Sequence, residues 1–276
     1  VDIVEIDVQK TSDGHFVLMH DPKLNRTTNG KGKVSQRTLK YILGLKLKDA
    51  KGNLTNYSVP TLDSVLKIIK GKIILNIDKS NGIFDQLIPI IQSHQCDSFV
   101  ILKGNNSAAY FNNYYNLYPK GPLFMPIKNG SNTSLDSFLI TTNTKLIEIL
   151  LKSDSDFIFK PSVTQLIHSL GCKLWFNPLF NSISGGHTEH VNAIQSWDWF
   201  IQHEAKIIQT DFPFELMEYL IGQKLHPKPP SFKMPGLKNL PNGNLQKNLK
   251  TTLTRKKSSL RRNKKIKKYK KGLKKH

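Results

Sequence analysis

The chain lacks the features that would place it among disulfide-rich or membrane-spanning proteins. It has only two cysteines in 276 residues, and Cys172 opens an apolar run, so we expect Cys96 and Cys172 to be buried free thiols. No run of 18 apolar residues occurs, which argues against a membrane span. A signal peptide is also missing, but the chain opens at Val1 in mid-strand without an initiator Met, so this absence excludes nothing.

Acidic residues are absent from the C-terminal part of the chain. All 20 Asp and Glu lie at or before Glu218, whereas 19 of the 41 Lys and Arg lie from Lys224 onward. The net charge of +21 therefore belongs mostly to the tail, and residues 1–223 are nearly neutral. A Pro- and Gly-rich stretch, 225–243, separates the two. We predict one domain over 1–223, followed by a linker and a basic tail over 224–276.

The tail has little apolar content and cannot bury enough surface to offset the entropy of ordering, which predicts disorder. Tyr269 is its one aromatic residue from Thr251 onward, so no base-stacking platform is visible. The simplest interpretation is a solubilising or anion-attracted extension. Weak contact with anionic lipid or nucleic acid is the alternative.

Short apolar runs alternate with helical patterns along the rest of the chain, which is typical of parallel β-α units. Strands are expected at 3–8, 72–79, 98–103, 122–127, 156–160, 172–179 and 206–213. Helices are expected at 61–70, 84–94, 108–118, 143–153, 162–170, 192–205 and 214–222. An open doubly wound sheet remains an alternative, but a (β/α)8 TIM barrel is favoured.

Polar residues near the carboxyl ends of the predicted strands favour the barrel, because that rim is where barrel enzymes build their sites. An open sheet would gather them at one switch point. These residues are Glu5, Asp7, Asp78, Lys79, Lys160, Asn177 and Asp211. Seven strands in a barrel of eight imply that the first β-α unit is missing and that the barrel seam is open.

The motif Glu5-Ile6-Asp7 is unusual inside an apolar strand. Side chains alternate along a strand, so both carboxylates point to one face and repel each other unless a cation lies between them. Asp78, at the end of the next barrel strand, would add a third oxygen. The three carboxylates together predict a Ca²⁺ or Mg²⁺ site. The alternative is that Glu5 is a solvated strand residue paired with a lysine.

His20 ends the next apolar run, which follows the Asp13-Gly14 turn and leads back toward the same rim. An imidazole there could accept or donate a proton near neutral pH. Taken alone, such a histidine is more often a packed or surface residue. The remaining histidines at 15, 94, 168 and 203 are interpreted as structural.

These residues closely resemble the glycerophosphodiester phosphodiesterase family, whose hallmark is a Glu-x-Asp strand followed by a His-Asp motif. The matching blocks run from Val1 to about Leu225: "VEIDVQKTSDGHFVLMHDPKLNRTTNGKGKV", "VPTLDSVL", "IILNIDKS", "LWFNPL", "SGGHTEH" and "IIQTDFP". The resemblance implies a TIM barrel with a small insertion at 22–58. It also implies a divalent metal on Glu5, Asp7 and Asp78, although the family commonly has Glu at the third position.

The same resemblance implies roles for further residues. His20 matches one of two catalytic histidines, and Lys79 matches a basic residue beside the phosphate. Trp175 is expected to line the glycerol or head-group pocket, with core packing as its alternative. His187, in a glycine-rich loop, is expected either to face the site or to lie on the surface. The family's His-Arg-Gly motif, which precedes the Glu-x-Asp strand, is missing, so we expect impaired activity.

The expected reaction is metal-dependent hydrolysis of glycerophosphodiesters to sn-glycerol 3-phosphate and an alcohol. Three alternatives remain open: a phosphatidylinositol phospholipase C-like lyase, a non-catalytic phosphodiester-binding barrel, and a nucleic-acid binder that depends on the tail. The resemblance favours a periplasmic or secreted location.

Overall fold

The computed structural model describes residues 1–78 and 80–227. Lys79 and the predicted tail beyond residue 227 lie outside these described residues. The chain divides into two compact units, Val1–Trp175 and a second that begins at Phe176. Within the described part, no helix combines the length and the apolar character needed to cross a membrane. That one barrel domain covers 1–223 stays a prediction.

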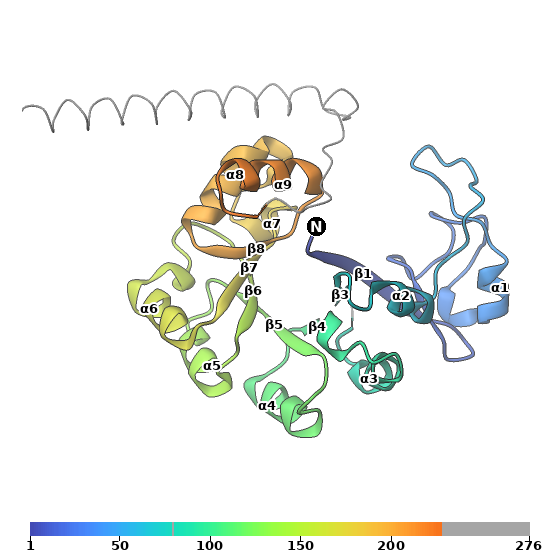
Figure 1. Ribbon diagram of the computed structural model, residues 1–276, viewed down its shortest axis with the longest axis horizontal. Coiled ribbons are helices and arrows are strands. Elements are labelled where there is room, and N and C mark those ends of the chain that lie inside the picture. Colours follow the sequence, from blue (N-terminus) through green and yellow to red (C-terminus); the bar gives the residue numbers. More distant parts are fainter. Residues whose placement is uncertain (79, 228–276) are drawn as a thin grey trace, which may run out of the picture. The chain divides into compact units, whose positions relative to one another are not determined.

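The first unit is built on neighbouring parallel strands (Figure 1). In spatial order they are β1 (Ile3–Lys10), β3 (Ile74–Asp78), β4 (Val100–Gly104), β5 (Leu123–Asn129) and β6 (Leu146–Leu150). β7 (Lys173–Phe176) begins beside β6, where Lys173 N donates to Lys145 O at 2.9 Å. A short strand, β2 (Phe16–Leu18), pairs antiparallel with β1 after a turn in which Gly14 has φ +92°. The predicted hairpin is therefore present.

Helices cover one face of these strands (Figure 1). They are α2 (Leu62–Ile69), α3 (Phe84–Ser93), α4 (Ala108–Leu117), α5 (Leu135–Thr142) and α6 (Pro161–Leu170). Side-chain caps start two of them: Thr61 Oγ1 accepts from Ser64 N at 3.1 Å, and Ser107 Oγ accepts from Tyr110 N at 3.2 Å. The α2, α3 and α4 positions agree with the predicted helices within a residue or two.

The main core lies between the sheet and these helices. Leu75 and Ile77 of β3, with Leu102 of β4, pack there against helical residues such as Leu66 and Leu87. Because side chains alternate along a strand, the intervening residues of β3 and β4 point to the other face. That other face carries the polar residues of the candidate site.

Residues 22–58 follow β2 and pack around a small core separate from the main one. That this stretch is an insertion stays a prediction. It contains a 3-10 turn, η1 (Val34–Gln36), and a short helix, α1 (Leu39–Leu43). The buried residues of this core are Leu24, Val34, Ile42 and Leu45 from the stretch itself, with Val17, Met19 and Val59 from the segments that flank it. A second 3-10 turn, η2 (Asp97–Phe99), leads into β4.

The second unit contains α7 (Asn181–Ser184), α8 (Glu189–Gln202), β8 (Ala205–Ile208) and α9 (Pro213–Gly222). Gln209 N, just after β8, donates to Phe176 O at 3.0 Å. Its core joins α8 to α9 through Trp197 and Tyr219, both fully buried.

Two neighbouring predictions were wrong. The stretch 143–153, predicted as a helix, contains strand β6, and the stretch 156–160, predicted as a strand, contains the 3-10 turn η3 (Phe157–Phe159). Asn143, at φ +47°, is the C-cap residue of α5, a helix that was not predicted from the sequence. A short continuous apolar run fits a buried strand as well as a buried helix, and here burial on both faces decided for the strand. Lys160 consequently is the N-cap residue that precedes α6 and does not end a strand.

The cysteine prediction is confirmed. Cys96 and Cys172 are both buried and free. Burial raises the pKa of the Cys172 thiol to about 11 and also raises that of Cys96, so both are held in the unreactive thiol form.

Candidate functional site

Three carboxylates converge near the carboxyl ends of β1 and β3. In the parallel register Asp7 pairs with Asp78, and Glu5 pairs with Asn76 two positions before it. Glu5, Asp7 and Asp78 are half-buried, and one oxygen from each lies within 4.8 Å of the others. The structure therefore brings together the three acids that the sequence predicted would meet.

This donor set fits a hard divalent cation. Three anionic oxygens at such short separations repel one another, and a cation with oxygen preference would relieve that repulsion. Asn76, on the same face and opposite Glu5, is fully buried, and both atoms of its amide lack a hydrogen-bond partner among the described residues. Burying an amide without hydrogen-bond partners destabilises the folded state. The Asn76 amide is therefore available, beside the three acids, to bind a ligand or water at this site.

A buried lysine contacts the same cluster. Lys103 Nζ lies 3.0 Å from Asp78 Oδ2 and 3.1 Å from Glu148 Oε2. The side chains of Lys103 and Glu148 are each 3% exposed, whereas that of Asp78 is 36% exposed. Neither Lys103 nor Glu148 was predicted from the sequence as a site residue. The predicted basic residue, Lys79, lies outside the described residues, and its role stays a prediction.

The two carboxylates keep Lys103 charged. Burial by itself lowers the pKa of this amine, but attraction to Glu148 and Asp78 outweighs burial and raises the pKa above its ordinary value. The ammonium is therefore the form present at neutral pH. It offsets part of the negative charge that the carboxylates gather at this rim.

His20 directly follows Met19, whose backbone N donates a hydrogen bond to the carbonyl oxygen of Asp7 in β1 at 3.1 Å. The His20 side chain is 66% exposed, and its Nδ1 lies 2.8 Å from Asp21 Oδ1. Arg26 donates to both oxygens of Asp21, at 2.7 and 2.8 Å. These hydrogen bonds from Arg26 and then His20 hold the pKa of Asp21 well below its usual range. The ionised Asp21 carboxylate fixes the orientation of the imidazole through Nδ1. A role of His20 in proton transfer stays a prediction.

Trp175, His187 and Lys160, which the sequence also marked as candidates for the site, each lie beside different side chains. Trp175 is 2% exposed, and its indole Nε1 has no hydrogen-bond partner among the described residues, so its substrate role stays a prediction. The His187 ring stacks on Trp199 with the ring centroids 3.9 Å apart. Lys160 places its Nζ 4.8 Å from the Phe157 ring centroid.

The second unit holds another acidic group, Glu189 with His190 and Asp211. Glu189 is fully buried, and its carboxylate accepts hydrogen bonds from Trp197 Nε1 (2.9 Å), Thr210 Oγ1 (2.7 Å) and Asp211 N (2.6 Å). Burial raises the pKa of Glu189 despite these bonds. Through these three hydrogen bonds the Glu189 carboxylate connects α8 to the segment that follows β8.

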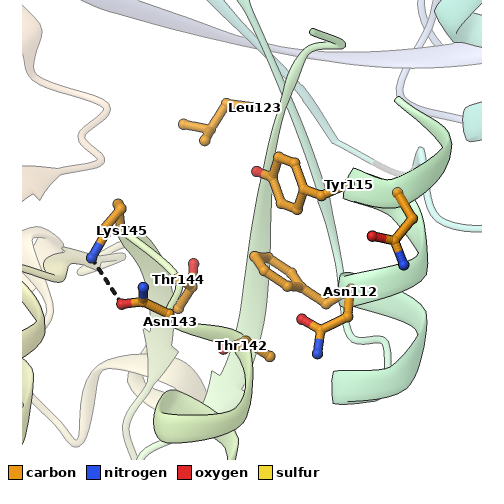
Figure 2. Close-up of a pocket in the computed structure, with 9 residues that line it drawn as sticks. Asn112, Tyr115, Leu123, Thr142, Asn143, Thr144 and Lys145 are labelled. Carbon is orange, nitrogen blue, oxygen red and sulfur yellow. Dashed lines mark hydrogen bonds between the residues drawn. The ribbon is translucent and has the colours of Figure 1, made fainter. Parts of the chain in front are cut away.

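A pocket of about 520 Å³ lies at the amino-terminal ends of β5 and β6, whereas the acidic cluster lies near the carboxyl ends of β1 and β3 (Figure 2). It is lined by α4, by the first residue of β5 and by the turn from α5 into β6, through Asn112, Tyr115, Leu123 and residues 142–145. Lys145 Nζ donates to Asn143 Oδ1 at 2.8 Å within it. None of the residues predicted for the catalytic site lines this pocket.

Comparison with known proteins agrees with this geometry. Residues 1–97 match the model of the Glycerophosphoryl diester phosphodiesterase family, and residues 122–220 match a Domain of unknown function. A glycerophosphodiester phosphodiesterase of Caldanaerobacter subterraneus subsp. tengcongensis is 35% identical over 116 residues, covering 38% of this chain and 46% of the relative. One from Bacillus subtilis (strain 168) is 42% identical over 74 residues, covering 24% and 25%. The chain thus spans less than half the length of these curated relatives.

Solved structures match over most of the chain. A glycerophosphoryl diester phosphodiesterase from Parabacteroides distasonis ATCC 8503 has a TM-score of 0.64 and 26% identity, with 83% of this chain and 78% of that chain covered. An Oleispira antarctica phosphodiesterase, solved in complex with the product sn-glycerol-3-phosphate, has a TM-score of 0.53 and 18% identity, covering 75% and 81%. The second similarity shows the fold alone.

A curled, mainly parallel sheet with an acidic cluster at the carboxyl ends of its strands defines an α/β-barrel protein of the TIM type, which confirms the predicted fold class. The N-terminal part of the chain is similar in sequence to the glycerophosphodiester phosphodiesterase family, and the chain is similar in fold to solved structures of that name.

Proposed function

We propose that this protein hydrolyses glycerophosphodiesters to sn-glycerol 3-phosphate and an alcohol, using a divalent cation held by Glu5, Asp7 and Asp78. The observation that carries the proposal is the convergence of these three carboxylates, with oxygens within 4.8 Å, at the rim where barrel enzymes place their chemistry. The similarity of residues 1–97 to the glycerophosphoryl diester phosphodiesterase family supports this substrate class. A bound Ca²⁺ or Mg²⁺ would act as a Lewis acid on a phosphoryl oxygen.

The residues of the chain would handle the protons and the remaining charge. Hydrolysis needs a group that accepts a proton from the nucleophile and a group that donates one to the leaving alcohol. His20 is proposed for one of these steps through Nε2, because Asp21 holds Nδ1 at 2.8 Å. Lys79 is proposed to contact the phosphate, as the family resemblance implies. Trp175 is proposed to line the glycerol or head-group pocket, because of its place near the carboxyl end of β7.

The test is a direct assay. Purified chain is incubated with sn-glycero-3-phosphocholine and either Ca²⁺, Mg²⁺ or EDTA, and released glycerol 3-phosphate is measured with a coupled dehydrogenase. We expect release that requires one of the two ions and stops with EDTA. Cyclic inositol phosphate from a phosphatidylinositol substrate would instead indicate a lyase. Substrate binding without turnover would indicate a non-catalytic barrel.

We also propose that the basic segment 224–276 contacts anionic lipid or nucleic acid through charge alone. Its 19 Lys and Arg stand without a single acid, so binding should weaken steeply as salt rises. We expect the full chain to co-sediment with phosphatidylserine vesicles or retain DNA at low salt, and a chain ending at Leu225 to do neither. The thermal midpoint should be nearly the same for both chains. A large drop on truncation would show that the tail stabilises the folded part.

A periplasmic or secreted location is proposed on the family resemblance. Activity confined to the cytoplasmic fraction of the source cells would contradict it.

A further inference from the structure

We propose that Lys103 and Glu148 form a buried ion pair that holds Asp78 in the orientation needed to bind the cation. Lys103 is thus a positioning residue, since it contacts Asp78 and acts on the metal through that carboxylate. This inference rests on the proposed metal site, and the experiment below separates the two.

The placement of the pair follows from the strand register. Ile77 pairs with Leu102, so the next residues, Asp78 and Lys103, are neighbours on the same face of the sheet. Glu148 lies on β6, two strands beyond β4, and Lys103 spans the intervening β5 to reach it. Lys103 Nζ is therefore held between Asp78 Oδ2 at 3.0 Å and Glu148 Oε2 at 3.1 Å.

Asp78 needs such support more than a buried ligand would. It is the last residue of β3, and its side chain is 36% exposed. A carboxylate has two oxygens, so it can accept from Lys103 through Oδ2 and still offer an oxygen to a cation. A bond to a fixed ammonium restricts rotation of the carboxylate, which lowers the entropy lost when a cation binds.

Glu148 fixes the ammonium in turn. A lysine side chain has several rotatable bonds, and a single contact with the half-exposed Asp78 would restrain it weakly. Glu148, at 3% side-chain exposure, gives the ammonium a second, rigid partner inside the sheet. Carboxylates and lysines are seldom buried unless they are paired, and each of these two residues provides the partner that the burial of the other requires. Supporting partners of metal ligands typically contribute about 10–100-fold to metal affinity.

The test is divalent-ion affinity, measured by calorimetry with Ca²⁺ and with Mg²⁺ on the full chain. The main variant is Lys103→Met combined with Glu148→Gln, which removes one positive and one negative charge and so leaves the net charge of the site unchanged. We expect its affinity to fall about 10–100-fold. Lys103→Met alone is avoided for this purpose, because the added negative charge would itself attract the cation.

Glu148→Asp alone is the milder second variant, because Asp keeps the negative charge but is one methylene shorter, so it holds the Lys103 ammonium less firmly. It should lower affinity by a smaller factor, and it decides the matter if the double variant does not fold by circular dichroism. Lys128→Met is the matched control: this half-buried lysine on β5 donates to Asn106 O at 2.6 Å and lies 4.4 Å from the Phe138 ring centroid. Its affinity should equal that of the wild type.

Wild-type affinity in the folded double variant, or in Glu148→Asp when the double variant does not fold, would overturn the positioning role while leaving the metal site intact. A wild-type chain that binds neither ion would overturn the role and the metal site together. Normal binding without hydrolysis would contradict the proposed function alone.

Discussion

Replacing Asp7 by Asn is expected to abolish divalent-cation binding and, with it, metal-dependent hydrolysis. Asp7 pairs with Asp78 across β1 and β3, and with Glu5 the pair offers oxygens within 4.8 Å of one another. Asn keeps an oxygen but loses the charge, and anionic oxygens dominate the affinity of such sites. Glu5→Gln should behave in the same way. Calorimetry with Ca²⁺ and Mg²⁺, followed by the glycerol 3-phosphate assay, measures both losses.

Thermal unfolding provides an independent check on the same variant. A ligand that binds only the folded state raises the thermal midpoint, so Ca²⁺ or Mg²⁺ should stabilise the wild type but not Asp7→Asn. Without metal, the variant should be at least as stable as the wild type, because one of three mutually repelling charges is gone. Asp85→Asn, on the exposed start of α3, is the control and should retain wild-type binding. Unchanged affinity in Asp7→Asn would rule out the site.

Replacing His20 by Ala is expected to slow hydrolysis by about 10²–10⁴-fold, the usual contribution of one general acid–base group. Divalent affinity should stay at the wild-type value, because His20 is proposed to move a proton and not to bind the metal. The side chain is 66% exposed, so its removal should cost little stability. Rates measured at saturating substrate and metal, alongside calorimetry, separate the two effects.

His15→Ala is the matched control for this experiment. His15 and His20 are both exposed and flank β2 on its two sides, but His15 lies in the hairpin turn after Asp13. We expect wild-type turnover from His15→Ala. Asp21→Asn should slow hydrolysis less than His20→Ala, since it removes only the carboxylate that orients the imidazole at 2.8 Å. Wild-type turnover from His20→Ala would assign the proton transfer to another group.

Local patterns predicted most of the helices and strands. The β1–β2 hairpin followed from an Asp-Gly turn, and α2 and α4 begin at Thr61 and Ser107 caps that are visible in the sequence. The region 143–160 was predicted wrongly because an apolar run of this length fits either element. That error had a functional consequence: a helical Glu148 would face solvent, whereas on β6 it is buried beside Lys103.

The sequence by itself determined the acids of the site, since the spacing of Glu5 and Asp7 requires them to share one face of a strand, whatever the fold around them. It also determined the family resemblance of the N-terminal part, the free thiols and the concentration of positive charge beyond residue 223. Only the tertiary structure decided that Lys103 and Glu148 form a buried ion pair beside those acids. Lys103 and Glu148 are 45 residues apart along the chain, and nothing local marks either as buried. Strand register brings them together, because pairing between neighbouring strands is a long-range choice that alternation along one strand does not encode.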